Sequence, residues 1–141
     1  MSGGGWILKT EPSEYSFERL AQERRAVWDG VSNPVALRHL REMAVGDHVV
    51  IYHTGDQKAA VGLARVARAA YPDPKANDPK LVVVDIEYVK PLPHPVTLKE
   101  IKADPAFAES PLVRMGRLSV GPVTAAEWKR LMTMGGEARE K

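Results

Sequence analysis

Apolar and polar positions along the chain follow the two spacings that distinguish strands from helices. Residues 81–89 (LVVVDIEYV) give the clearest strand pattern, because valine and isoleucine are interrupted by polar residues two positions apart. Pro91, Pro93 and Pro95 follow and are expected to end this strand. Shorter apolar runs predict further strands at residues 5–10, 48–53, 59–70 and 117–123. In residues 48–53 the alternation is only partial, which indicates a strand buried on both faces.

Short helices are marked by the residues that cap their N-termini. Ser16 stands before an apolar run, and Asn33 is followed by Pro34, whose missing N–H costs nothing at the first helical position. The segments TLKE at 97–100 and TAAE at 124–127 have the form of capping boxes. The chain therefore alternates strands with at least four short helices.

These elements predict one α+β domain that covers residues 1–141. Three or four of the strands are joined by loops too short for helical crossovers, which favours antiparallel pairing and a small mixed barrel with helices on its flanks. The polar residues 22–27 are expected to link the first helix to a loop at residues 28–31. Residues 1–4 and 135–141 are expected to be flexible.

Composition excludes several classes of protein. There is no cysteine, so disulfides and cysteine-based zinc sites are excluded, and a reducing, cytoplasmic location is expected. Residues 1–5 lack the basic and apolar regions of a secretory signal, and no run of about 18 apolar residues is present, so no membrane association is expected. The formal charge of +2 is too small to indicate a protein that wraps many phosphates, although a protein holding one base would not need more.

Motifs for catalysis or for cofactor binding are absent from the sequence. None of the four histidines lies at a metal-ligand spacing from another, and the chain has neither a GxGxxG segment nor a phosphate-binding loop. The serines lack the surroundings of a catalytic nucleophile. We therefore expect no metal and no cofactor.

Four segments at strand ends instead combine aromatic or cationic side chains with hydrogen-bonding groups. They are residues 6–15 (WILKTEPSEY), 28–33 (WDGVSN), 52–54 (YHT) and 114–120 (RMGRLSV). A nucleobase pocket needs this mixture, because flat aromatic walls stack on the ring and polar groups read its edge. Arginine or lysine at the mouth of such a pocket would meet phosphate.

The same segments, extended and in order over about residues 6–131, resemble the sequence blocks of the EVE domain family. The opening block is WILKTEPSEYSFERL, the second is WDGVSNPVALRHLREMAVGDHVVIYHT, and the closing block is RMGRLSVGPVTAAEWKRL. The resemblance implies a PUA-like fold, a mixed and mainly antiparallel β-barrel with short flanking helices. It also implies binding to modified bases, such as methylated or hydroxymethylated cytosine, in DNA or RNA. A single EVE domain could also have protein partners in a larger system.

The resemblance assigns a role to each matching position. Trp28 is expected to form the stacking wall. Apart from the resemblance, Arg114 and Arg117 bracket a glycine near the expected pocket mouth and are expected to contact phosphate. The expected base-binding residues are Lys9, Thr10, Glu11, Trp28, Asn33, Tyr52, His53, Thr54, Leu118 and Ser119. Two positions depart from the family pattern, since Ser32 stands where an arginine is frequent and Thr54 where a serine is frequent.

Other interpretations of these residues remain open at this stage. Lys9 and Glu11 could form a solvated ion pair, His53 could be a structural histidine at a strand end, and both arginines could be solvated charges. The related ASCH branch of PUA-like folds includes amidohydrolases with a lysine, threonine and glutamate set, which residues 9–11 would supply. Against this, Thr10 should point away from Lys9 and Glu11 on a strand. A scaffold domain without a pocket is the third alternative.

Overall fold

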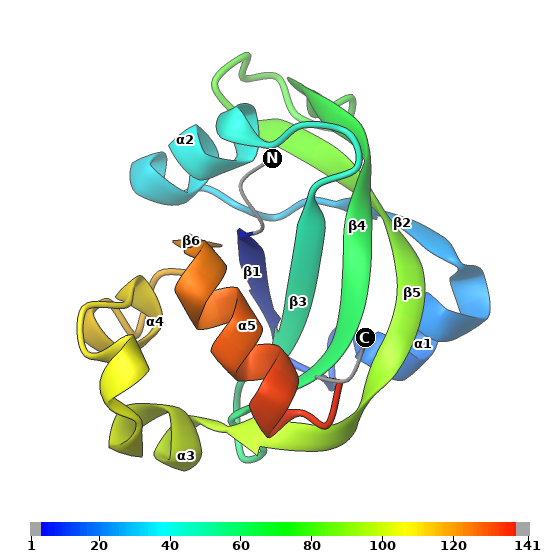
Figure 1. The fold of residues 1–141 in the computed structure, drawn as a ribbon. Coiled ribbons are helices and arrows are strands. Elements are labelled where there is room, and N and C mark those ends of the chain that lie inside the picture. Colours follow the sequence, from blue (N-terminus) through cyan, green and yellow to red (C-terminus); the bar gives the residue numbers. More distant parts are fainter. Residues whose placement is uncertain (1–3, 138–141) are drawn as a thin grey trace.

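A six-stranded sheet forms the centre of the protein in the computed structural model, which describes residues 4–137 (Figure 1). The strands are β1 (Gly5–Thr10), β2 (Arg25–Trp28), β3 (His48–His53), β4 (Ala59–Pro72), β5 (Val82–Thr97) and β6 (Val120–Val123). Their order is β2-β5-β4-β3-β1-β6, and every pair is antiparallel except β1 with β3. The predicted α+β, mainly antiparallel architecture is confirmed, but the ladder stays open, with β2 and β6 as its edges.

Helices lie on both sides of this sheet. They are α1 (Phe17–Glu23), α2 (Pro34–Glu42), α3 (Leu98–Ala103), α4 (Pro111–Arg114) and α5 (Ala125–Met134), with a 3₁₀ turn at Pro105–Phe107. All four predicted caps are confirmed: Ser16 accepts from the Arg19 N–H, Asn33 accepts from two N–H groups of α2, and both capping boxes close. The helix starts are thus fixed by local side-chain chemistry.

Two apolar clusters lie on opposite faces of the sheet. Neighbouring residues of β3 alternate between them, so that Val49 and Ile51 join the cluster with α1 and α2, whereas Val50 and Tyr52 join the cluster with α3, α4 and α5. Figure 1 shows α5 lying across the face of β1 and β3. The prediction that residues 48–53 are buried on both faces is therefore confirmed.

Three predicted boundaries are wrong. Residues 25–28 form β2, paired with Val84–Glu87 of β5, instead of a link and the start of a loop. The strand β6 begins at Val120, because residues 116–117 form a turn. β5 does not end at the prolines but continues to Thr97. Over residues 91–97, β4 is its only strand neighbour within residues 4–137, and proline is tolerated on such an edge.

The structure describes the chain from Gly4 to Glu137, so the first three and last four residues lie outside it. The expectation of flexible ends concerns residues 1–4 and 135–141, of which residues 1–3 and 138–141 lie outside the described residues. Gly4 is buried, and Glu137 forms an ion pair with Lys90 at 2.5 Å. Within residues 4–137 no helix has the length and apolar character needed to cross a membrane.

Candidate functional site

A pocket of about 420 Å³ opens where the end of β1 faces the segment that follows β2. Its walls come from residues far apart in the sequence: Lys9, Thr10, Glu11, Glu14, Tyr15, Val27, Trp28, Asp29, Gly30, Val31 and Ser119. Ser119 reaches the pocket because the Lys9 N–H donates to its carbonyl at 2.9 Å, which extends the pairing of β1 with β6 by one bond. The pocket volume falls within the range of small-molecule sites.

Two aromatic rings meet at one wall of this pocket. Trp28, the last residue of β2, is only 8% exposed and packs in the core, yet it also lines the pocket. The Tyr15 ring meets it edge to face, with centroids 5.9 Å apart and an interplanar angle of 89°. This T-shaped arrangement is favoured by the ring quadrupoles and holds both rings in place beside the pocket.

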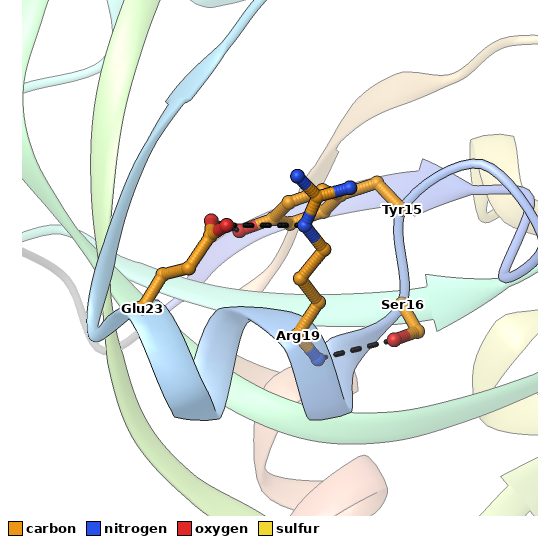
Figure 2. A network of polar contacts seen from close by, with 4 residues as sticks. All are labelled: Tyr15, Ser16, Arg19 and Glu23. Atoms are coloured by element: carbon orange, nitrogen blue, oxygen red, sulfur yellow. Dashed lines mark hydrogen bonds and ion pairs between the residues drawn. The ribbon is translucent and has the colours of Figure 1, made fainter.

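Tyr15 is held by a polar network that runs along α1, which Figure 2 shows. Its hydroxyl donates to Glu23 Oε1 at 2.7 Å, and the Arg19 Nε donates to the other carboxylate oxygen at 3.0 Å. The Arg19 guanidinium lies 5.3 Å from the centre of the Tyr15 ring. Burial and the hydrogen bond to Glu23 raise the pKa of Tyr15, and the same bond, together with that from Arg19, lowers the pKa of Glu23.

Replacing Tyr15 with phenylalanine is expected to destabilise the protein at neutral pH, by an amount that shrinks in acid. Because the folded-state pKa of Glu23 lies below its ordinary value of 4.5, the network stabilises the fold fully above that pH. The stabilisation is lost as the pH falls through the lowered pKa. Urea unfolding of both proteins at pH 7 and pH 3 measures this difference.

The double variant Tyr15→Phe/Glu23→Gln provides the control for this effect. In a Glu23→Gln background no carboxylate titrates at this position, so the further change of Tyr15 should cost the same at both pH values. An equal cost of Tyr15→Phe at pH 7 and pH 3 in the otherwise unaltered protein would contradict the assignment.

Lys9 forms the boundary between the main pocket and a smaller neighbour. Its Nζ donates to the Gly116 carbonyl at 3.0 Å and lies 5.6 Å from the centre of the Tyr52 ring. Burial lowers the pKa of this lysine. The neighbouring pocket, of about 150 Å³, is lined by Lys9, Tyr52, Thr54, Gly55, Lys58, Leu98, Leu112 and Gly116.

The other two residues of the KTE segment are also held by hydrogen bonds. The Thr10 hydroxyl donates to the Tyr15 carbonyl at 2.8 Å, which folds the loop after β1 back onto the strand. Glu11 accepts from the backbone N–H and the hydroxyl of Ser13, each at 3.2 Å. No ion pair joins Lys9 to Glu11 in the part of the chain that the structure describes.

The structure brings together only half of the expected base-binding residues. Those that line the main pocket are Lys9, Thr10, Glu11, Trp28 and Ser119. Tyr52 and Thr54 line the smaller neighbour. A third depression, of about 380 Å³, contains Asn33 and Leu118 together with the expected phosphate contacts Arg114 and Arg117.

Two of the expected base-binding side chains are already engaged elsewhere. His53 is 2% exposed, its Nε2 accepts from the Phe17 N–H at 3.0 Å, and its Nδ1 lies 2.7 Å from Gln57 Oε1. The Asn33 side-chain oxygen accepts from the N–H groups of Val35 and Ala36. The Asn33 side chain thus caps α2, and the His53 side chain links β3 to α1. His53 lines none of these pockets.

Several pocket residues were not among those expected from the sequence. They are Glu14, Tyr15, Val27, Asp29, Gly30 and Val31. Tyr15 belongs to the segment WILKTEPSEY, but its contact with Trp28 depends on how β2 pairs with β5. Ser32, where the family pattern often has arginine, is exposed and does not line the main pocket.

The family model of the EVE domain matches residues 5–134, which is nearly the whole described chain. The chain belongs to the EVE domain family. This EVE domain is similar to thymocyte nuclear protein 1 of Mus musculus. The two are 31% identical over an alignment of 163 positions, gaps included, which covers 92% of this chain and 72% of that protein.

Solved structures agree with this membership. A protein of Rhodopseudomonas palustris is 42% identical, with a TM-score of 0.91 and coverage of 97% of this EVE domain and 96% of that chain. Human THYN1 protein, in a complex with DNA that contains 5-methylcytosine, is 26% identical, with a TM-score of 0.85 and coverage of 98% and 99%. An ASCH protein of Zymomonas mobilis, at 14% identity and a TM-score of 0.56 over 92% of this chain and 94% of that one, shares the fold alone.

Proposed function

We propose that this EVE domain is a non-catalytic module that holds a modified base of DNA, such as a modified cytosine, in the pocket beside Trp28. The observation that carries the proposal is the pocket itself, which combines an aromatic wall with polar groups of both charges. The human relative with 5-methylcytosine DNA supports it, because that structure aligns with 98% of this chain.

The pocket has the chemistry that a base turned out of its stack would need. Trp28 and Tyr15 provide aromatic surface, and the carboxylates of Glu11, Glu14 and Asp29 could accept from an exocyclic amino group. The Lys9 ammonium has three N–H donors, of which one is committed to Gly116. Recognition of a base by this set requires no covalent step.

Phosphate contact is proposed for Arg114 and Arg117 in the depression beside the pocket. The pocket and the depression lie next to each other along two segments of the chain. In one segment Val31 lines the pocket and Asn33 the depression, and in the other Ser119 lines the pocket and Leu118 the depression. Phosphate contacts at this position would orient the strand without reading its sequence.

Binding to matched oligonucleotides tests the proposal. Fluorescence anisotropy should show tighter binding of labelled DNA that carries one 5-methylcytosine than of the same DNA with plain cytosine. The corresponding RNA pair decides between DNA and RNA, because only RNA has a 2′-hydroxyl. Equal affinity for the modified and plain members of both pairs would contradict the proposal.

The amidohydrolase alternative requires Lys9, Thr10 and Glu11 to act together on a substrate. Each of them instead forms a hydrogen bond with the backbone of another residue of this protein: Gly116 for Lys9, Tyr15 for Thr10 and Ser13 for Glu11. Incubation with acylated cytidines followed by chromatography separates the two functions, and we expect no turnover.

A further inference from the structure

Three lysines surround a shallow depression at the end of the molecule that carries α3. The depression, of about 470 Å³, is lined by Asp56, Gln57, Lys58, Thr97, Leu98, Lys99 and Lys102. We call Lys58, Lys99 and Lys102 the lysine track. All three side chains belong to exposed residues, and Asp56 is the single carboxylate among the lining residues.

The acidic residues of α3 and its end do not neutralise the lysine track. The Glu100 carboxylate accepts from the backbone N–H and the hydroxyl of Thr97, and it lies 3.6 Å from His94. Asp104 pairs with Arg130 at 2.6 Å. Within residues 4–137 no lysine of the track forms an ion pair, so the depression has an excess of positive charge.

The backbone fixes the position of the track. Lys58 is the last residue of the loop between β3 and β4, and its φ of 47° is a left-handed conformation that residues other than glycine seldom adopt. Its carbonyl accepts from the Leu98 N–H at 2.8 Å, which ties the hairpin to the first residue of α3. Figure 1 shows this hairpin and α3 side by side. Lys58, Lys99 and Lys102 therefore belong to one connected unit.

Three hollows that share lining residues lie between the track and the proposed base pocket. The depression shares Lys58 and Leu98 with the smaller pocket of about 150 Å³. That smaller pocket shares Lys9 with the main pocket beside Trp28. A strand leaving the main pocket on the side of Lys9 would therefore pass along the lysine track, whereas Arg114 and Arg117 lie in the depression that contains Asn33.

We propose that Lys58, Lys99 and Lys102 bind the phosphodiester backbone of the DNA strand that leads away from the base held beside Trp28. This inference rests on the proposed function, because the track is connected to the base pocket through Lys9. Lysine binds phosphate as a point charge and needs no fixed orientation, which suits a backbone whose sequence varies. The track therefore contributes affinity without distinguishing modified from plain bases.

The salt dependence of binding measures these contacts. The variant Lys99→Gln/Lys102→Gln keeps good helix formers on α3, and Lys58→Asn keeps a residue that tolerates the left-handed conformation. For single-stranded DNA with one 5-methylcytosine, each lost lysine contact should reduce the slope of log K against log salt concentration by about 0.7. The ratio of affinities for modified and plain DNA should stay unchanged. Lys129→Gln on α5, which is also exposed, is the matched control and should leave the slope unchanged.

The outcomes separate this inference from the proposed function. If the wild type prefers modified DNA but the track variants keep its salt slope, the lysine track is overturned and the proposed function stands. If the wild type shows no preference but the track variants lower the slope, the proposed function is overturned and the backbone contact is supported. No binding of any DNA by the wild type would overturn both.

Discussion

Trp28→Ala is expected to remove the preference of the domain for DNA with a modified base. The loss of a stacking partner should weaken binding by roughly 1–3 kcal/mol. In dissociation constants this is about a 5- to 150-fold change. Anisotropy titrations with the modified and plain oligonucleotides measure both the weaker binding and the lost preference.

The fold must be tested separately in this variant, because Trp28 also packs in the core. A buried tryptophan replaced with alanine typically costs about 3–5 kcal/mol of stability. Trp28→Phe retains an aromatic face and most of the packing beside Tyr15, so it should keep the fold and part of the preference. Trp128→Phe is the matched control, since Trp128 stacks on His48, away from the pocket. Undiminished preference in a folded Trp28→Ala variant would show that Trp28 is not the stacking wall.

Gly62→Ala is expected to destabilise the protein by overpacking its core. Gly62 lies in β4, and a Cβ built on it would overlap the ring of Phe17. Phe17 is 4% exposed, and its N–H donates to His53, so the ring has little room to move away. Inserting a methyl group into such a site typically costs about 1–3 kcal/mol, which urea unfolding at constant m-value would show.

A second glycine and a compensating change make the test of Gly62 specific. At Gly121 in β6 a Cβ would have its nearest neighbours at 3.7–3.9 Å, which is ordinary contact, so Gly121→Ala should change stability little. The pair Gly62→Ala/Phe17→Leu should recover part of the loss, because leucine leaves space beside position 62. Equal effects at both glycines would contradict the steric explanation.

Much of the fold could be predicted because its signals are local. Ser16 and Asn33 mark the starts of their helices through hydrogen bonds to N–H groups two or three residues away. The alternation in residues 48–53 indicated a strand with two buried faces. Such features depend on spacing along the chain and need no knowledge of its distant parts.

What the sequence could not predict depends on distant pairing. In the segment RAVW only Ala26 and Trp28 face the core, while Val27 is 50% exposed. Two apolar positions are too short a pattern to predict a strand, and the segment is one because it pairs with β5. The residues of the candidate site were equally hard to predict. Tyr15 lies beside the pocket because its ring packs against Trp28, and His53 lies outside the pocket because it accepts a hydrogen bond from Phe17. Family resemblance predicted which segments would contribute to a site, but only the folded structure shows which of their side chains line the pocket.

The three prolines of β5 have a consequence for how copies of the chain behave at high concentration. An uncovered strand edge with free N–H groups is a template for pairing with another molecule and so for aggregation. Pro91, Pro93 and Pro95 have no N–H to offer, and the His94 N–H is already donated to the Gly135 carbonyl. This stretch of β5 is therefore a poor partner for a strand of a second chain.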